Sequence, residues 1–296
     1  MRWKRDAGLT LRMFMTMFLL ALVYLFFLTI LYAYGVGLTG LLLFAGIFLF
    51  IQYYFSDKLV LMGTRARIVS ENDFPELYGI VRKLAMEANL PMPRVAIVDT
   101  PIPNAFATGR NPKNAVVAVT TGLLRTLNRE EIEAVIGHEL SHIKNRDVAV
   151  ITIASFLSTV AFFIMRWAMF MGMFGGFGGG RRENGLSSIA LFTISALVWL
   201  ISFLLIRALS RYREFAADMG SAFLTKNPRA LISALVKISG KMEYVNPDAK
   251  KEIEGMNAFF IIPAVSGKSL LSLFSTHPPI EKRIERLERL ATEIGY

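Results

Sequence analysis

Residues 11–55 read LRMFMTMFLLALVYLFFLTILYAYGVGLTGLLLFAGIFLFIQYYF and contain one charged residue, Arg12. A helix needs about 20 apolar residues to cross the hydrocarbon core of a bilayer. The segment divides into two runs of this length, Leu11–Tyr34 and Val36–Phe55, around the turn-prone sequence GVG at 35–37. We therefore predict a tight hairpin of two transmembrane helices in this part of the chain.

Two later runs are also long enough to span a bilayer, from Val148 to Phe170 and from Ser187 to Ile206. A glycine-rich loop, residues 172–186, separates them. The alternative is that these runs are buried helices of a soluble protein, but such helices rarely hold more than about 18 uninterrupted apolar residues. The first run of the chain is too long for a signal peptide, and a second span follows it directly. The sequence therefore predicts four transmembrane helices.

The composition agrees with a membrane protein. Hydrophobic residues make up 54% of the chain and charged residues 19%, below the roughly 25% of soluble domains. There is no cysteine, which excludes disulfides, thiolate metal sites and a cysteine nucleophile. A net charge of +10 would suggest a nucleic-acid partner in a soluble protein, but here basic residues flank the apolar runs and set topology against anionic lipid. We expect the lipid bilayer as a partner and no nucleic acid, and nothing in the sequence defines an oligomeric state.

The basic residues also predict which way the chain faces in a cell membrane. Cytoplasmic flanks of transmembrane helices carry an excess of Lys and Arg. Such residues precede the first span and follow the fourth, at Arg2, Lys4, Arg5, Arg207, Arg211 and Arg213. An even number of spans then places both termini and both polar blocks in the cytoplasm. The predicted divisions are a hairpin (1–55), a first polar block (56–147), a second pair of spans (148–206) and a second polar block (207–296).

The first polar block is predicted to be a small α+β unit. Its pattern indicates a helix over residues 72–88 with Asn72 as N-cap, and strands over Arg94–Asp99 and Ala115–Thr120. Residues 101–106 (PIPNAF) are predicted to form a turn-prone loop between the strands. Asn128 and Glu131 have the spacing of a capping box, which predicts that a further helix begins there.

The second polar block is predicted to be mostly helical. Asn227-Pro228 and Pro278-Pro279 each indicate a helix start, because proline is favoured in the first turn. The last of these helices has its apolar residues on one face, namely Ile280, Ile284, Leu287 and Leu290.

The helix that begins near Asn128 carries the sequence HELSH at 138–142, an H-E-x-x-H motif. Residues four apart share one face of a helix, so His138 and His142 can reach the same metal ion. Glu139 projects toward the same cavity, where it can take a proton from a metal-bound water. The alternative is an unrelated pair of histidines. It is weakened because the chain has 3 histidines and two of them stand at this spacing.

A third ligand is expected to be a carboxylate or a histidine, with the fourth position left for water. His277 is available, but Glu214 is better placed. His142 lies six residues before the third predicted span and Glu214 eight residues after the fourth, about 9 Å and 12 Å by helical rise. Two antiparallel helices that leave one membrane face would bring these side chains to similar heights.

Two further residues are expected at the site. Asp218 shares a helix face with Glu214 and can accept the other ring N–H of a ligating histidine. The alternative for both carboxylates is a surface ion pair with Arg211 or Arg213. His277, held by two prolines, can donate a hydrogen bond to the oxyanion of a tetrahedral intermediate, and its alternative role is to cap the following helix.

Five segments in this order resemble the membrane zinc metalloproteases that include the heat-shock-linked protease HtpX and, more distantly, the CaaX prenyl proteases. The segments are residues 104–107 (NAFA), 120–124 (TTGLL), 138–147 (HELSHIKNRD), 214–218 (EFAAD) and 276–283 (THPPIEKR). The four-span layout and modest length are closer to the HtpX type, since the CaaX proteases are longer and have more spans.

The resemblance implies a mainly α integral membrane protein, with four transmembrane helices and a cytoplasmic zincin-like α+β core that has a small sheet. It implies one Zn²⁺ per chain, with Glu214 as third ligand. It also implies that Asn104 lies near the cleft, for which the alternative is a simple turn residue. It further implies a sheet edge that pairs with the substrate backbone, at Ala115, Val117 and Val119.

The expected function is a zinc-dependent endopeptidase with Glu139 as general base. The resemblance implies a stress-response role in membrane-protein quality control, in which cytoplasmic segments of misfolded or damaged membrane proteins are cut. One alternative is a CaaX-type protease that cleaves prenylated peptides. An alternative of another class is a non-catalytic membrane scaffold in which His277 closes a structural zinc site.

Overall fold

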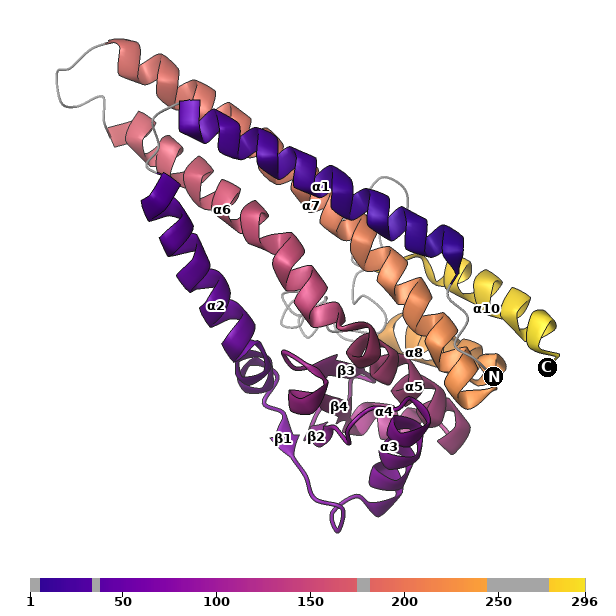
Figure 1. Cartoon of the computed structure of the whole chain (residues 1–296). Helices are drawn as coiled ribbons and strands as arrows, with labels where there is room; N and C mark the ends of the chain where they lie inside the picture. Colours follow the sequence, from indigo (N-terminus) through magenta and orange to yellow (C-terminus); the bar gives the residue numbers. More distant parts are fainter. Residues whose placement is uncertain (1–5, 34–37, 175–181, 244–276, 296) are drawn as a thin grey trace.

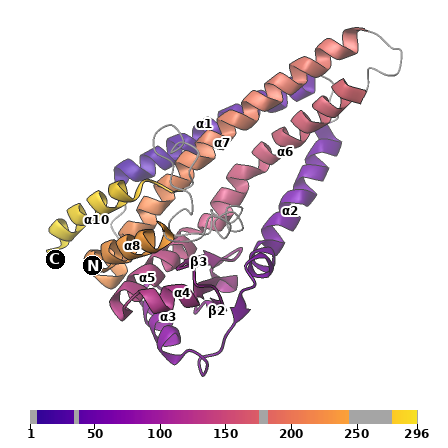
Figure 2. The same cartoon turned by 180° about the vertical axis from the view of Figure 1, so that it is seen from behind.

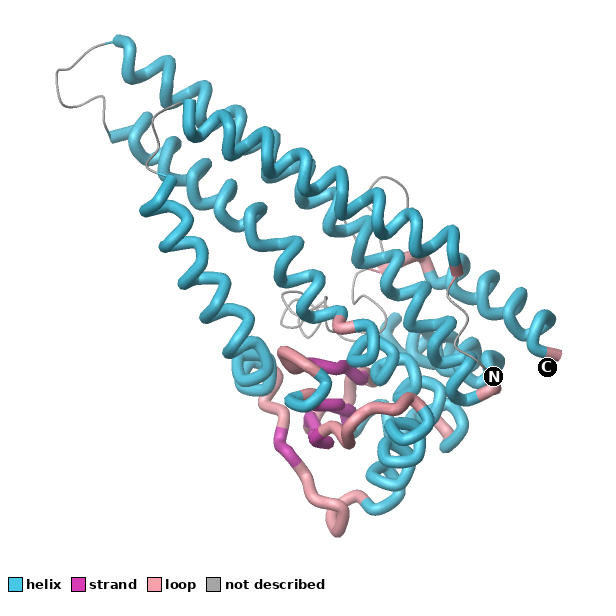
Figure 3. Tube along the Cα trace, viewed as in Figure 1, coloured by secondary structure: helices cyan, strands magenta, loops and turns pink. Residues whose placement is uncertain are grey.

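A computed structural model describes residues 6–33, 38–174, 182–243 and 277–295. Four long helices run beside one another, and a small sheet with shorter helices packs at one end of them (Figures 1 and 3). The long helices are α1 (Ala7–Ala33), α2 (Leu38–Gly63), α6 (Asp147–Phe174) and α7 (Arg182–Thr225). The predicted turn at 35–37 and residues 175–181 of the predicted glycine-rich loop lie outside the described residues, and the rest of that loop belongs to α6 and α7.

Within the described part of the chain, three stretches are long and apolar enough to cross a membrane. They are Ala7–Ala33, Asp147–Arg166 and Ile189–Thr225. A helix of 26 residues, α2, stands where the second span is predicted, and the prediction of four full crossings stays a prediction. The fourth predicted span is part of α7, which continues beyond Ile206 as one helix of 44 residues through Glu214 and Asp218. The placement of Glu214 by helical rise assumed this continuation.

The sheet has four short strands, β1 (Arg67–Ile68), β2 (Arg94–Val98), β3 (Ala105–Thr108) and β4 (Val116–Thr120), in the order β1-β2-β4-β3. β2 and β4 run parallel, and β3 is antiparallel to β4. The two predicted strands are confirmed. The predicted loop over 101–106 is wrong at its end, because Ala105 and Phe106 already pair with Val119 and Ala118.

The position of β4 corrects the predicted substrate edge. Residues Ala115, Val117 and Val119 were expected at a free edge, but β4 lies between β2 and β3 and its backbone is paired on both sides. Their side chains are buried in the core below the sheet. Among the strands that the structure describes, β3 forms the edge on this side of the sheet, and sequence patterning missed it because two prolines precede it.

The shorter helices are α3 (Pro75–Glu87), α4 (Thr121–Thr126), α5 (Arg129–Asn145), α8 (Pro228–Glu243) and α10 (Ile280–Ile294). The prediction of Asn72 as an N-cap is wrong, because α3 begins at Pro75 behind Phe74 and has no side-chain cap. The other starts are confirmed. The Oδ1 of Asn227 accepts the backbone N–H of Ala230 at 3.0 Å, and Pro279 precedes α10.

The apolar core fixes the place of α5, which lies between the sheet and the other helices. One face of the sheet packs on α3, α5, α8 and α10 through a single apolar cluster that includes Val117, Leu140 and Leu287. The opposite face packs against the end of α2, at Val60 and Leu61. Both views show α1, α7 and α6 side by side, with α10 and the start of α1 at the end nearest the sheet (Figures 1 and 2).

Glu131 fixes the start of α5. The predicted capping box is present, since Asn128 Oδ1 accepts the N–H of Glu131 and the Glu131 carboxylate accepts the N–H of Asn128, both at 2.9 Å. The same carboxylate, 3% exposed, accepts hydrogen bonds from Ser233 at 2.6 Å and Lys237 at 2.9 Å on α8. Burial works to raise the pKa of Glu131, but these hydrogen bonds outweigh it and the pKa lies below its ordinary value.

We predict that Glu131→Gln lowers the free energy of unfolding by about 1–3 kcal/mol at pH 7, because a buried hydrogen-bonded charge is lost. A carboxyl whose folded pKa is depressed contributes stability above its unfolded pKa, and that contribution is lost as pH falls through the folded pKa. The gap between wild type and variant, measured by chemical denaturation in detergent, should therefore close below about pH 4. Glu133→Gln on the same helix, whose partners are exposed Lys83 and Arg129, is the control and should change stability little.

Candidate active site

His138 and His142 lie on one face of α5, and their Nε2 atoms are 3.1 Å apart. Both positions follow from the helical spacing of the motif. His138 is 1% exposed, and the His142 side chain is 17% exposed and faces a cavity. The two rings meet edge to face, with centroids 4.7 Å apart. The predicted convergence of the two imidazoles on one point is therefore present in the structure.

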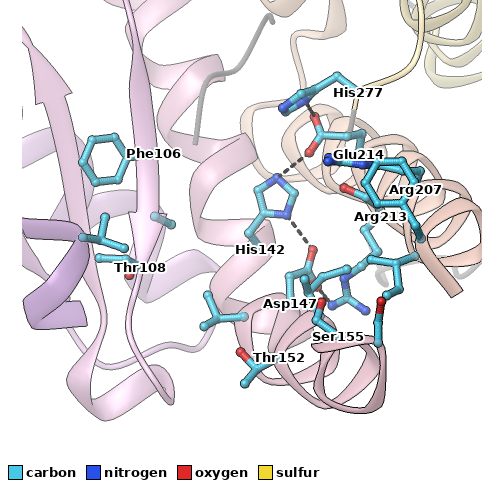
Figure 4. A pocket seen from close by; sticks show the side chains of 18 of the residues that line it. Phe106, Thr108, His142, Asp147, Thr152, Ser155, Arg207, Arg213, Glu214 and His277 are labelled. Carbon is cyan, nitrogen blue, oxygen red and sulfur yellow. Dashed lines mark hydrogen bonds and ion pairs between the residues drawn. The ribbon is translucent and has the colours of Figure 1, made fainter. Parts of the chain in front are cut away.

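Glu214 reaches the same point from α7. Its Oε2 lies 3.6 Å from His138 Nε2. Its Oε1 lies 3.4 Å from His142 Nε2, and Figure 4 shows this second contact. One ligand atom from each of the three residues lies within 4.8 Å of the other two. Tetrahedral zinc with bonds of about 2.0–2.2 Å holds its ligand atoms about 3.3–3.6 Å apart. The donor set and its spacing therefore fit zinc.

This convergence requires α5 and α7 to approach closely. Gly137, directly before His138, faces α7, and a Cβ placed there would lie 3.2 Å from Ser221 Oγ and 3.3 Å from a Thr225 methyl group. The Ser221 hydroxyl donates to the backbone oxygen of Ala134 at 2.6 Å. Small residues thus let the two helices touch at the level of the metal ligands.

Each histidine presents its second ring nitrogen to a carboxylate. His138 Nδ1 lies 3.0 Å from Asp218 Oδ1. His142 Nδ1 lies 2.5 Å from Asp147 Oδ2, and Figure 4 shows this second contact. Such contacts fix the tautomer that leaves Nε2 free for a metal. Burial lowers the pKa of His138, but its contacts with Asp218 and Glu214 outweigh this and leave the pKa raised. Asp218 was predicted in this position, whereas Asp147 was not.

Two buried arginines in turn hold these carboxylates. Arg283 on α10, 2% exposed, donates to Asp218 through Nε at 2.9 Å and a terminal nitrogen at 2.6 Å, and another terminal nitrogen lies 3.5 Å from Glu214. Arg213 on α7 pairs with Asp147 and donates to the backbone oxygen of Asn145 at 3.2 Å.

Sequence reasoning missed both arginines. A signal for Arg283 was present, since it stands three residues after Ile280 and four before Leu287, on the apolar face of the last helix. The prediction assigned Arg207 and Arg213 to membrane topology, but Arg213 is buried in the site and Arg207 lines the cavity. The alternative of a surface ion pair for Glu214 and Asp218 is wrong, because both carboxylates are buried.

Glu139 lies on the same cavity as the ligands and is 4% exposed. Burial raises the pKa of its carboxyl, and the nearby His138 and His142 oppose this rise without cancelling it. The backbone N–H of Ala107 on β3 donates to the same carboxylate. The edge strand β3 and the predicted base are therefore adjacent.

The cavity has a volume of about 720 Å³ and is lined by β3, the end of α2, and parts of α5, α6 and α7. His277 lines it as well, with Nδ1 at 2.9 Å from Glu214 Oε2 (Figure 4). Asn104 is buried just before β3, where its backbone N–H donates to Thr120 Oγ1 at 2.8 Å, and it is not among the lining residues. The roles predicted for these two residues stay predictions.

The sequence profile of peptidase family M48 matches residues 71–291, which include every residue of this site. The chain belongs to peptidase family M48. It is 57% identical over 294 residues to "Protease HtpX homolog 2" of Methanosarcina mazei, covering 99% of each chain. It is also 57% identical to "Protease HtpX homolog" of Moorella thermoacetica, over 98% of this chain and 96% of that protein.

A solved structure shows a related fold. The crystal structure of S. mikatae Ste24p superposes with a TM-score of 0.58 at 17% sequence identity, covering 95% of this chain and 66% of that one. The resemblance inferred from sequence is thus confirmed, and the chain is a metalloprotease of the M48 family with apolar helices suited to a membrane. This family membership implies a metal, typically zinc, and the group His138, His142 and Glu214 can bind one. The scaffold alternative is thereby set aside.

We predict that Gly137→Val weakens zinc binding at least about tenfold, because a branched side chain forces α5 away from α7 and misplaces Glu214. Zinc affinity, measured by competition with a chromophoric chelator, is the readout. Gly79→Val on α3 is the control, since a Cβ there meets nothing within 4 Å. Equal zinc affinity in the two variants would contradict the packing argument.

We also predict that Arg283→Gln weakens zinc binding about 10–100-fold, the usual effect of removing a group that orients a metal ligand. Arg286→Gln is the control, because Arg286 points the other way, to Asp6 and the Phe215 ring. The Co²⁺-substituted protein should show a changed visible spectrum in the first variant only. An unchanged spectrum and zinc affinity in Arg283→Gln would mean that Arg283 serves the fold alone.

Proposed function

We propose that the chain is a zinc-dependent endopeptidase of the membrane that cuts cytoplasmic segments of misfolded or damaged membrane proteins. The observation that carries the proposal is the arrangement around the cavity. Three ligands from α5 and α7 converge there, and Glu139 faces the same space without belonging to the ligand group. Catalytic zinc sites share this form, with three protein ligands and an open position.

In this proposal Glu139 acts as the general base. Zinc, when bound, supplies Lewis acidity to the scissile carbonyl and to the attacking water. The Glu139 carboxylate takes the proton of that water and passes it to the leaving amine. Its raised pKa suits the step, because a base with a pKa nearer neutrality is also a competent acid. His277, which also lines the cavity, is proposed to donate a hydrogen bond to the oxyanion.

The substrate is proposed to lie along β3. β3 is the outermost strand on this side of the described sheet, it lines the cavity, and its Ala107 N–H is adjacent to Glu139. An extended peptide that adds to a sheet edge gains its affinity from backbone hydrogen bonds, which accommodate many sequences. Such loose selectivity suits an enzyme that meets many damaged proteins.

The proposed topology has both termini and the active site in the cytoplasm. The sheet, the beginnings of α1 and α6 and the ends of α2 and α7 lie at one end of the long helices (Figures 1 and 2). This arrangement supports one common side for both polar blocks. Arg213 is buried in the site, where it pairs with Asp147. The proposal that the polar blocks face the cytoplasm therefore depends mainly on the positive charges of Arg2, Lys4 and Arg5.

The prenyl-peptide alternative is decided by substrate preference. The likeness to Ste24p concerns the fold, and no residue geometry described above selects an isoprenoid. We expect the purified zinc enzyme to cut an unfolded membrane-protein segment as well without a farnesyl group as with one. Marked preference for a farnesylated C-terminal peptide would favour the CaaX-type activity instead.

We predict that Glu139→Gln retains zinc and the wild-type melting temperature but loses about 10²–10⁴-fold in the rate of peptide cleavage. Metal analysis, thermal unfolding and mass spectrometry of the cleavage products measure the three quantities. Glu133→Gln, one helix turn or more from the cavity on the same helix, should cleave at the wild-type rate. Wild-type cleavage by Glu139→Gln would remove Glu139 from the mechanism.

A further inference from the structure

The cavity does not end at the metal ligands but continues along the facing sides of α6 and α7. Its lining includes Thr152, Ser155 and Thr159 on α6, and Ser210, Phe203 and Trp199 on α7. Figure 4 shows Thr152 and Ser155 beyond Asp147 along α6, away from His142. These residues lie in the stretches that are apolar enough to cross a membrane. We call this extension the α6–α7 groove.

Small side chains create the groove on the α6 side. Thr152, Ser155 and Thr159 recur at intervals of three and four, so they lie on one face of the helix. A leucine at any of these positions would fill the space. The Thr159 hydroxyl donates to the backbone oxygen of Ser155 at 3.0 Å. Its oxygen therefore keeps a lone pair that can accept a hydrogen bond from a bound molecule.

Aromatic side chains close the far end and one wall. The Phe162 and Trp199 ring centroids are 6.1 Å apart, and those of Trp199 and Phe203 are 5.7 Å apart. The Arg207 guanidinium lies 4.6 Å from the Phe203 ring centroid and lines the cavity. The groove is thus apolar at its end and offers hydroxyls and one cation along its length.

The length of the groove can be estimated from helical rise. Fifteen residues separate Asp147 from Phe162 on α6, and fifteen separate Glu214 from Trp199 on α7. Each wall is therefore about 22 Å long. An extended polypeptide advances about 3.3 Å per residue, so the groove holds about six or seven residues.

We propose that the α6–α7 groove is a substrate subsite that binds about six or seven residues of an extended, apolar polypeptide segment directly beside the scissile bond. This inference rests on the proposed function. The groove opens directly onto Glu139 and β3, so a chain bound there continues into the cleavage site. A polypeptide also supplies backbone N–H groups for the hydroxyls and carbonyls for Arg207, which the acyl chain of a lipid lacks. The substrate class is therefore a membrane-protein segment whose apolar part has lost its helix beside a polar cleavage site.

The absence of cysteine from the chain makes a direct test possible. Thr159→Cys places one thiol in the groove. Thr193→Cys places one on the exposed side of α7, where the threonine hydroxyl likewise bonds to its own helix. Each is combined with Glu139→Gln so that the peptide is not consumed. The probe is a synthetic peptide with a polar segment around the mapped cut site, an apolar Leu/Ala run and a single cysteine moved along that run.

Disulfide formation under mild oxidation is expected several-fold more strongly at position 159 than at 193. It is expected only for probe cysteines about five or six residues from the cut site, because Thr159 lies twelve residues beyond Asp147, about 18 Å along α6. Equal reaction at both positions, or reaction with cysteines next to the cut site only, would overturn the proposal. The readout does not require hydrolysis. A wild-type enzyme that cleaves nothing would therefore contradict the proposed function. In that case no cut site is mapped, and the subsite is decided by whether probe cysteines anywhere in the apolar run react with position 159 and not with position 193.

A second pair of variants tests the same subsite through kinetics. Thr159→Leu should raise KM for the probe about tenfold, because its added bulk excludes part of the apolar segment. Thr193→Leu makes the same change outside the groove and should leave kcat and KM unchanged. If Thr159→Leu alters neither constant but lowers the amount of lipid that co-purifies, the groove is a lipid site and the proposal fails.

Discussion

The close contact between α5 and α7 is the constraint on which the rest of the structure depends. Gly137 and Ser221 allow the two helices to touch, and only then do two histidines from one helix and Glu214 from the other share a point. α5 is fixed against the sheet by the apolar core, and α7 is fixed against α1 and α6 along the membrane part. The metal site therefore joins two parts of the chain, each of which packs around its own apolar core.

Charge burial at the site is tolerable because every carboxylate meets a cationic or hydrogen-bonding group. Asp218 lies between His138 and Arg283, and Asp147 lies between His142 and Arg213. A buried charge without such partners would cost several kcal/mol. The arginines also tie distant segments together, since Arg283 brings α10 to the ligands and Arg213 links α7 to the start of α6.

The sequence predicted those features that depend on local spacing. The paired histidines, the cap at Asn128 and the helix start at Asn227 each follow from residues within one or two turns, and all are present. Glu214 was predicted because the number of residues between it and the predicted span gives, along a helix, its distance from the membrane, and this distance is similar to that of His142. The edge strand β3 and the role of Arg283 were missed, because they depend on partners such as Val117 or Asp218 that are distant in sequence. Asp147 was quoted within a motif, but only the fold shows what it contacts.

We expect His138, His142 and Glu214 to bind one catalytic zinc. X-ray absorption at the zinc edge, together with metal analysis, tests this most directly. We predict about one zinc per chain, with two imidazoles and oxygen ligands at about 2.0–2.2 Å. We also predict loss of zinc stoichiometry in Glu214→Ala. Full zinc occupancy with an unchanged spectrum in Glu214→Ala, or a coordination shell with three imidazoles, would contradict this expectation.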